Sequence, residues 1–453
     1  MPDAVVLARL QFAMTIMFHY IFPPLTIGLS LLMVVMEGLY LRTGDKTYES
    51  LTRFWTRIFA ATFVMGAATG VVMEFQFGTN WAGYSRFVGD VFGPALAAEG
   101  ILAFFLESCF LGILVFGWDR VPPRVHFLAA VMVALGSTLS AFLITTANSW
   151  QQTPAGHVLV GTGPLMKAQM ADFWAMVFNP SALPRFFHVL FGSYVQGAFV
   201  VMGVSAWYIL RGRHLDFAKK GFKLAFGLGL AASLSLLFTG HKQAVIMALH
   251  QPAKCAALEA LYTGADHAAL PLFGFPDDES RTLRFSVEIP GLLSWLVHGP
   301  KGGRVAGLDE FPVEDWPPVF LSFQFYHAMI GLGMAFIGWL LLNAFLLRRD
   351  RLFHHKLLLK GHVAACILPF LANQFGWGAA ELGRQPWVVY GVLRTQDAVS
   401  TVVPAGHILA SIAMFGLLYA ALFAAWLFVL GTKIQHGPED AQGGGGKPPL
   451  PAL

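Results

Sequence analysis

The sequence predicts an all-α integral membrane protein with about nine transmembrane helices. Hydrophobic residues make up 56% of the 453 residues and charged residues only 12%, and the mean hydropathy is +0.60, a composition too apolar for a soluble globular protein. Continuous apolar runs long enough to cross a bilayer recur along the chain. None shows the alternation of an outer-membrane strand, so helices rather than a barrel are expected.

Nine apolar runs are the predicted spans. They cover residues 12–40, 54–75, 93–116, 125–147, 187–210, 221–249, 320–347, 360–380 and 406–430. The first run lacks a basic leader and a small-residue cleavage site, which indicates a mature helix rather than a removable signal. The chain thus divides into six helices within 1–249, a polar insertion at 250–318, three helices within 319–432 and a flexible tail at 433–453.

Basic residues fix the expected orientation. They gather in the first, third, fifth and seventh connections, which contain Arg42, Lys46, Arg53, Arg57, Arg120, Arg124, Arg211, Arg213, Lys219, Lys220, Lys223, Arg348, Arg349, Arg351, Lys356 and Lys360. By the positive-inside rule these connections face the cytoplasm. The N-terminus is therefore expected outside and, with nine helices, the C-terminus inside.

The insertion at 250–318 is acidic, rich in proline and glycine, and expected on the outer side as a loop with short helices. Connections of this length are usually functional or disordered. Lys254 and Glu259 lie in it five residues apart, which turns two helical side chains to different faces. Both are suited to address a third group, although by spacing alone solvated charges are the simpler explanation.

The sequence does not indicate a nucleic-acid site or a cysteine-based metal or disulfide site. The net charge of +4 does not indicate a nucleic-acid partner, because the distribution of the charges is dictated by topology. Cys109, Cys255 and Cys366 are far apart and form no metal-binding or disulfide pattern.

Ionisable residues inside predicted spans are functional candidates, because desolvation is costly unless they pair, titrate or bind. Glu99 and Glu107 share the third span, about 12 Å apart along the axis and roughly 80° apart around it. They can therefore line one side of a proton channel. Ser108 and Ser140 are positioned to extend such a relay, although serines in membrane helices more often bond to their own backbone.

His19, His188 and Met329 lie in the first, fifth and seventh spans. A single membrane histidine is usually a hydrogen-bonded interior residue, and methionine is a common apolar gap-filler. A His/Met pair is nevertheless an established axial ligand set for an electron-transferring haem. Glu381 and Arg384 end another apolar run near membrane depth, where an unpaired carboxylate is costly.

Several long motifs together resemble subunit I of cytochrome bd quinol oxidases, in order and over about residues 5–400. They are Arg9-Leu-Gln-Phe-Ala with His19 ten residues on, Glu74-Phe-Gln-Phe-Gly-Thr-Asn-Trp81, Glu99-Gly-Ile-Leu-Ala-Phe-Phe-Leu-Glu-Ser108, Phe187-His188 with Gly192-Ser-Tyr, Lys254-Cys-Ala-Ala-Leu-Glu259 and Gly376-Trp-Gly-Ala-Ala-Glu-Leu-Gly-Arg-Gln-Pro-Trp387.

The resemblance implies roles for the haem-site candidates. His188 and Met329 match the axial ligands of a low-spin haem b that accepts electrons from quinol. His19 and Glu381 match ligands of two high-spin haems, one of which binds dioxygen. The implied cofactors are two b-type haems and a third high-spin haem, d or b. Arg384 is then expected to face haem propionates.

The remaining matches concern protons and substrate. The resemblance places Glu99 beside the high-spin pair, assigns a proton route to Glu107, Ser108 and Ser140, and assigns quinol binding to Lys254 and Glu259. Two features depart from many relatives: His327 stands where those have Arg, and the outer loop has a short form. The quinone, ubiquinol or menaquinol, is left open.

The implied function is a subunit of a quinol:oxygen oxidoreductase in the bacterial cytoplasmic membrane. It oxidises quinol outside and reduces dioxygen to water with cytoplasmic protons, generating potential without a pump. The implied partners are a membrane subunit II and a small single-helix subunit.

Two rival functions lead to different expectations. A haem-copper oxidase or cytochrome b requires paired helix histidines that this sequence lacks. A proton-coupled transporter using Glu99 and Glu107 would contain no haem, so a visible absorption spectrum separates the classes.

Overall fold

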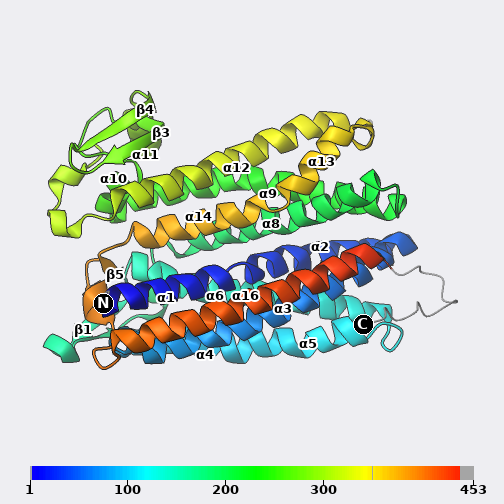
Figure 1. Ribbon diagram of the computed structural model, residues 1–453, viewed down its shortest axis with the longest axis horizontal. Helices are drawn as coiled ribbons and strands as arrows, with labels where there is room; N and C mark the ends of the chain where they lie inside the picture. The colour runs from blue at the N-terminus through cyan, green and yellow to red at the C-terminus, as the bar shows by residue number, and fades with distance from the viewer. Residues whose placement is uncertain (1–2, 349, 439–453) are drawn as a thin grey trace.

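The computed structural model describes residues 3–348 and 350–438 and shows a bundle of long, roughly aligned helices (Figure 1). Nine helical segments in these residues are long and apolar enough to cross a membrane, which confirms the predicted fold class. They are Ala4–Thr43, Lys46–Thr79, Ala82–Phe116, Pro123–Gln152, Ala182–Leu210, Leu215–His250, Val313–Leu347, Lys356–Leu382 and Ala405–His436. The first span starts about eight residues earlier than expected.

Proline interrupts two of these spans. The first consists of α1 (Ala4–His19) and α2 (Phe22–Thr43), and α2 opens with Pro23 and Pro24. The eighth consists of α13 (Lys356–Ala365) and α14 (Leu368–Leu382), with Pro369 in the first turn of α14. Proline has no N–H to continue a preceding helix but fits a first turn. The chain therefore breaks directly after His19.

The third span changes its helical winding at its centre. It contains α4 (Ala82–Ala98), a π-helical segment η1 (Glu99–Phe104) and α5 (Phe105–Phe116). Pro94 inside α4 precedes this change. A π-helical turn is uncommon and occurs frequently at functional sites, because it redirects side chains. Here it begins at Glu99.

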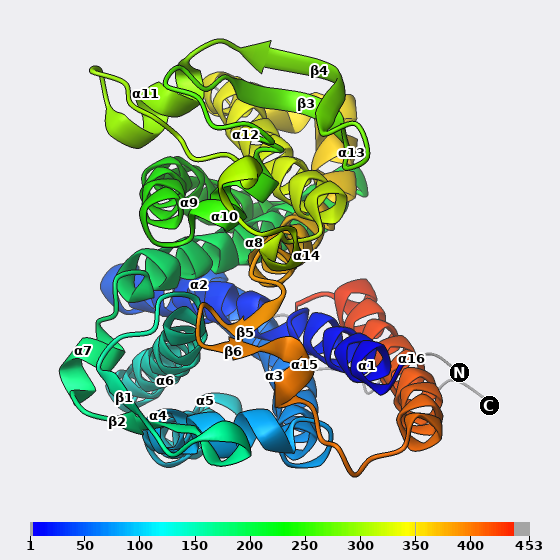
Figure 2. The ribbon, with the colours of Figure 1, turned by 90° about the vertical axis from the view of Figure 1, so that its left-hand side faces the viewer.

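The other long helices are continuous: α3 (Lys46–Thr79), α6 (Pro123–Gln152), α8 (Ala182–Leu210), α9 (Leu215–His250), α12 (Val319–Leu347) and α16 (Ala405–His436). Viewed along the bundle, the helices form two groups (Figure 2). One contains α8, α9, α12, α13 and α14; the other contains α1, α3, α4, α5, α6 and α16. We call these the α8 group and the α3 group.

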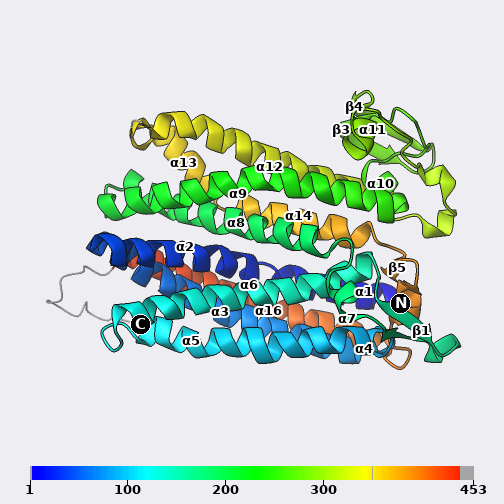
Figure 3. The same ribbon diagram turned by 180° about the vertical axis from the view of Figure 1, so that it is seen from behind.

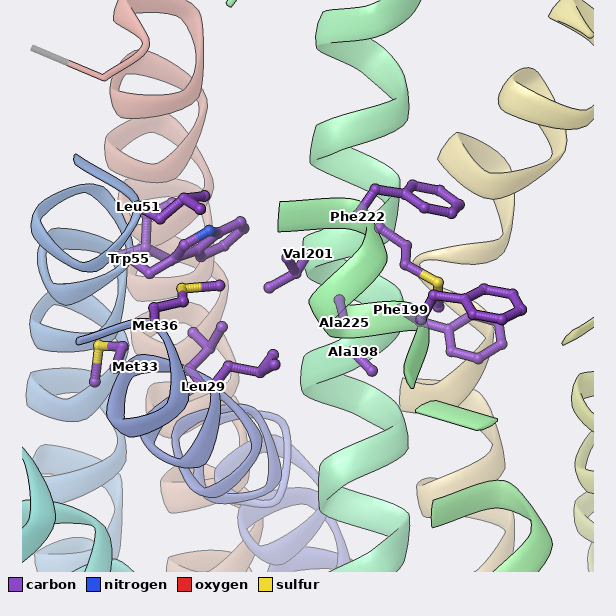
Figure 4. Packing of buried hydrophobic residues seen from close by; sticks show 14 of the residues in the cluster. Leu29, Met33, Met36, Leu51, Trp55, Ala198, Phe199, Val201, Phe222 and Ala225 are labelled. Carbon is purple, nitrogen blue, oxygen red and sulfur yellow. The ribbon is translucent and has the colours of Figure 1, made fainter. Parts of the chain in front are cut away.

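Helix α2 connects the groups by packing on α3, α6 and α8. At Gly28 and Gly197 the backbones of α2 and α8 come so close that a Cβ on Gly28 would lie 2.4 Å from the carbonyl oxygen of Ser193. Close approach through small residues is the usual basis of helix association in membranes. Around this crossing Trp55, Phe199 and other large side chains form the core (Figure 4).

The irregular segments gather at one end of the bundle, which we call the loop end (Figures 1 and 3). They comprise β1 (His157–Val160), β2 (Lys167–Met170), α7 (Phe173–Val177), α10 (Pro252–Leu258), β3 (Leu270–Asp277), β4 (Thr282–Ile289), α11 (Leu292–His298), β5 (Trp387–Val389), β6 (Leu393–Arg394) and α15 (Thr395–Ala398). The strands form three antiparallel pairs, β1–β2, β3–β4 and β5–β6.

Short 3₁₀ turns complete the described chain: η2 (Gly163–Leu165), η3 (Leu308–Glu310), η4 (Val313–Asp315) and η5 (Arg351–His354). The insertion at 250–318 contains short helices as expected, namely α10, α11, η3 and η4, but it also holds the β3–β4 hairpin. The connections rich in Lys and Arg lie at the opposite end of the bundle, which we call the basic end. α16 continues to His436, and the remainder of the expected tail, 439–453, lies outside the described residues.

Candidate functional site

His188 and Met329 belong to the α8 group. His188, on α8, lies against α9, with its Nδ1 3.1 Å from the Thr239 hydroxyl. Met329, on α12, points toward α14, where a Cβ added to Gly376 would lie 2.7 Å from its Sδ. Both α8 and α12 pack on α9 and α14. The two candidate ligands therefore share one group of four helices, and both side chains are half-buried.

His19 lies in the α3 group, at the break between α1 and α2. Its Nδ1 is 2.9 Å from the hydroxyl of Thr69 on α3. A Cβ added to the next residue, Gly70, would lie 3.3 Å from the imidazole Cε1. The ring therefore sits directly against the backbone of α3, which leaves its Nε2 edge on the other side.

Glu381 joins the two groups at the loop end. It lies in the last turn of α14, accepts a hydrogen bond of 3.0 Å from Asn148 of α6 and forms an ion pair with Arg384. Arg185 of α8 donates to the same Asn148 at 3.2 Å. Lys254 donates to the backbone oxygen of Ala380, directly before Glu381, at 2.8 Å.

This cluster holds an excess of positive charge. Arg185 and Arg384 lie around one carboxylate, Glu381, with Lys254 close by, and the Nε atoms of both arginines are buried without a partner among the described residues. Buried donors and charges are normally satisfied. The cluster is therefore suited to an anionic group with several oxygen atoms, such as a carboxylate-bearing cofactor.

Glu99 and Glu107 each bond to a serine of α6. Ser140 donates to Glu99 at 2.6 Å, and Ser137 donates to Glu107. Glu107 is 6% exposed. Ser108, predicted to extend the relay, lies on the exposed side of α5. Ser137, one helical turn from Ser140, is a contact that the sequence analysis missed.

Lys254 and Glu259 are both buried at the loop end, with exposed fractions of 3% and 4%. Neither residue is therefore a solvated surface charge in this fold. Lys254 Nζ donates to Gln152 Oε1 at 2.8 Å, and Glu259 lies beside His327, with Oε2 3.9 Å from its Nε2. The two side chains thus address different neighbours, as their spacing predicts.

Burial also shifts the ionisation of these two groups. It raises the pKa of Glu259 to about 8, because the charged carboxylate is poorly solvated there. Burial, followed by the charge of Arg185, holds the pKa of Lys254 well below its usual range. A carboxyl group that titrates near neutral pH is typical of acid–base sites.

A cavity of about 150 Å³ lies next to Lys254, with Phe311, Pro317, Trp387 and Tyr390 among its lining residues. These residues come from the long insertion and from the segment after α14. His327 links the insertion to α12. One ring nitrogen lies 3.0 Å from the carbonyl oxygen of Phe323 on α12, and the other lies 3.0 Å from the carbonyl oxygen of Pro271 in the insertion. Aromatic walls beside a buried polar group are usual for small-molecule sites.

Comparison with known proteins decides the family. The sequence profile of "Cytochrome bd terminal oxidase subunit I" matches residues 7–438. The chain belongs to this family. It is 40% identical to cytochrome bd ubiquinol oxidase subunit 1 of Bacillus subtilis over 444 residues, 96% of this chain and 94% of the relative.

Further relatives agree with this assignment. Cytochrome bd-II ubiquinol oxidase subunit 1 of Escherichia coli is 33% identical over 512 residues, with 98% of each chain covered. The bd oxidase structure from Geobacillus thermodenitrificans superposes with a TM-score of 0.89 at 29% identity, covering 96% of this chain and 99% of that one. The chain is therefore a quinol oxidase subunit of the bacterial inner membrane, and the family implies haem cofactors and a subunit II.

The residues predicted for a haem site fit such a group. A ring nitrogen of His19 and of His188 and the sulfur of Met329 are donors that haem iron accepts. Gly70 and Gly376 leave room at a ligand where a side chain would press on it. The unpartnered Nε atoms of Arg185 and Arg384 suit propionates.

The sequence analysis also missed Arg185, Asn148, Thr69 and Thr239. Arg185 carried a signal, because it is a charge three residues before His188 in an apolar run. Asn148 and the two threonines gave no such signal in the sequence. Uncharged polar residues are common in membrane helices, and only the packing shows what they contact.

Proposed function

We propose that this subunit oxidises quinol at the loop end and reduces dioxygen to water with protons taken from the basic end. The observation that carries the proposal is the order of buried groups along the bundle. Lys254 and Glu259 lie at the loop end, and Glu107, bonded to Ser137, lies farther toward the basic end. Among the candidate haem ligands, Glu381 lies beside Lys254 at the loop end, while His188, Met329 and His19 lie within the helices of the two groups.

His188 and Met329 would hold a low-spin haem b. His19 and Glu381 would hold two high-spin haems, one of them of b type and the other d or b. Bound haem stores electrons, and an iron with an open position binds dioxygen. The chain's own residues determine the charge and the hydrogen bonds around these groups. Arg185 and Arg384 neutralise acidic cofactor groups, and Asn148 holds Glu381 in place.

At the loop end, quinol oxidation releases two electrons and two protons. Glu259, with its pKa raised to about 8, accepts a proton from a quinol hydroxyl and returns it to the outer side. Such a base is effective because its pKa is close to the working pH. Lys254, held by Gln152 and Ala380, orients the quinol oxygen on the side nearer Glu381.

At the oxygen site, each oxygen atom reduced to water takes up two protons. Glu107 and Glu99, hydrogen-bonded to Ser137 and Ser140, pass these protons along α5, η1 and α6. Ser108 completes the route on the exposed side of α5. Because protons are released at one face and consumed from the other, each electron transferred separates a charge, worth about 2.3 kcal/mol per 100 mV.

We assign the loop end to the outside, because connections rich in Lys and Arg, at the other end, are expected in the cytoplasm. The complex contains subunit II, and we propose a small single-helix subunit as well. The quinone is ubiquinol or menaquinol. Bacillus subtilis has relatives named for each, the second being the putative cytochrome bd menaquinol oxidase subunit I at 34% identity.

A visible difference spectrum of the purified complex, reduced minus oxidised, tests this function against the transporter alternative. The proposal predicts a sharp low-spin b-type band together with high-spin haem signals, and oxygen uptake when quinol is added. A purified complex without haem bands would favour the proton-coupled transporter that uses Glu99 and Glu107.

A further inference from the structure

The two candidate histidine ligands share an arrangement that no predicted role explains. His19 and His188 lie in different helix groups, yet the Nδ1 of each is within hydrogen-bond distance of a threonine hydroxyl on the adjacent helix. The distances are 2.9 Å to Thr69 and 3.1 Å to Thr239. Each threonine is followed by a glycine that faces the ring edge, Gly70 or Gly240.

Counting protons indicates which atom donates in these two contacts. Each threonine hydroxyl also lies within hydrogen-bond distance of the carbonyl oxygen of the residue four positions back on its own helix, a usual acceptor for threonine in a helix. Thr69 bonds to Met65 at 2.8 Å, and Thr239 bonds to Ser235 at 3.3 Å. A hydroxyl has one proton but two acceptor sites. When that proton goes to the helix carbonyl, the hydroxyl accepts from the histidine Nδ1–H.

This assignment selects one form of each imidazole. A neutral imidazole has a single N–H, so a proton on Nδ1 leaves the lone pair on Nε2. Nε2 is then the nitrogen available to a metal ion, and it lies on the side of the ring away from the threonine. The adjacent glycine helps to seat the ring, since a Cβ would approach Cε1 to 3.3 Å at Gly70 and 3.5 Å at Gly240.

We propose that Thr69 and Thr239 are positioning residues that fix the tautomer and ring orientation of His19 and His188, so that Nε2 of each is preset as an iron ligand. The inference deepens the proposed function and rests on it. Groups that hydrogen-bond to metal-ligating histidines typically change metal affinity by about 10–100-fold when removed. They also raise the basicity of the ligand, which favours the oxidised metal.

The test uses the complete complex with Thr69→Val and Thr239→Val, which keep the side-chain shape but remove the hydroxyl. Thr239→Val should raise the midpoint potential of the low-spin haem, or lower its occupancy by about 10-fold or more, without changing the high-spin signals. Thr69→Val should affect only a high-spin haem and lower its ferrous iron–histidine stretching frequency in resonance Raman spectra. Thr→Ser at either position should restore wild-type values.

Thr52→Val is the matched control. Thr52 lies on α3, is fully buried and bonds to its own helix at the Tyr48 carbonyl, 2.9 Å away, as Thr69 does at Met65. Among the described residues its hydroxyl bonds to no candidate ligand, so its loss should leave all haem signals unchanged.

Two results would overturn the proposal. In the first, both valine variants keep wild-type potentials, occupancies and iron–histidine frequencies. In the second, each valine variant disturbs all haems equally, which indicates general damage rather than positioning. A wild-type complex without haem is a separate outcome, because it refutes the proposed function itself.

Discussion

At the residue scale, burial determines the chemistry of Lys254 and Glu259. Five residues of separation turn them toward Gln152 and His327, on different helices. Both are almost inaccessible, so neither charge is solvated, and burial raises the pKa of Glu259 to about 8. The carboxyl group therefore changes its protonation near pH 8.

A pH profile of quinol oxidation tests the role of Glu259. Below pH 8 the carboxyl group is mostly protonated and cannot accept a proton, so the rate should fall as the pH drops and level off above about 8. Glu259→Gln should lower the rate by about 10²–10⁴-fold and remove this inflection. Lys254→Ala should impair quinol oxidation with haem content intact.

Two controls accompany this profile. Glu288→Gln changes an exposed carboxyl group on β4 of the same insertion and should have no effect. An artificial electron donor that bypasses quinol should still drive oxygen uptake in the Glu259 and Lys254 variants. Unchanged quinol kinetics in both variants would show that neither residue acts on the substrate.

The axial pair is a second prediction at this scale. His188→Leu or Met329→Leu should remove the sharp band of the low-spin haem, because loss of one axial ligand opens the sixth position and weakens retention. Met202→Leu, at a fully buried methionine on α8 away from any predicted role, should leave the spectrum intact. A low-spin spectrum that survives both ligand substitutions would disprove the assignment.

At the element scale, the breaks in the helices matter more than their lengths. The first span breaks after His19, and the third changes to π-helical winding at Glu99. Both interruptions occur at residues predicted to carry function. On α6, Ser137 and Ser140 are one turn apart, and they bond to Glu107 and Glu99 respectively. The packing of α6 on α5 and η1 thus brings two carboxyl–hydroxyl pairs into one row.

Glu107→Leu should slow oxygen reduction about 100-fold by interrupting proton supply, whereas Glu107→Asp should be partly tolerated. Only a titratable group at that position can relay a proton, and a shorter carboxylate keeps the chemistry. Turnover and potential generation in reconstituted vesicles measure this, after haem content has been checked. A Leu variant with all its haems, normal turnover and normal potential would place the proton route elsewhere.

The sequence predicted the spans well and their interruptions poorly. Hydrophobic runs give the spans directly, but a run stays apolar across a break such as Tyr20–Ile21 or a π-helical turn such as Glu99–Phe104. The β3–β4 hairpin was missed because Pro271 and Pro276 argue against a strand. The Ser137 contact was missed because only the rotation of α6 against α5 determines it.

At the scale of the whole molecule, the proposed function assigns the two half-reactions to different ends of the bundle. Predicted ligands lie in both helix groups, and Glu381, bonded to Asn148, joins the groups at the loop end. Lys254 and Glu259, the proposed quinol-binding residues, lie at the end of the bundle predicted to be outside, while Glu107 lies toward the basic end. If the two half-reactions occur at these sites, as we propose, electron transfer between them generates potential without a pump.

The most direct test of this account is the proton balance of the purified complex, oriented in vesicles with the loop end outward, after quinol is added. The account predicts acidification of the outer medium by about one proton per electron, because quinol oxidation releases its protons there and oxygen reduction consumes protons from the lumen. A voltage, positive outside, should develop at the same time. Quinol-driven oxygen uptake with no voltage, or with proton release into the lumen, would contradict the account.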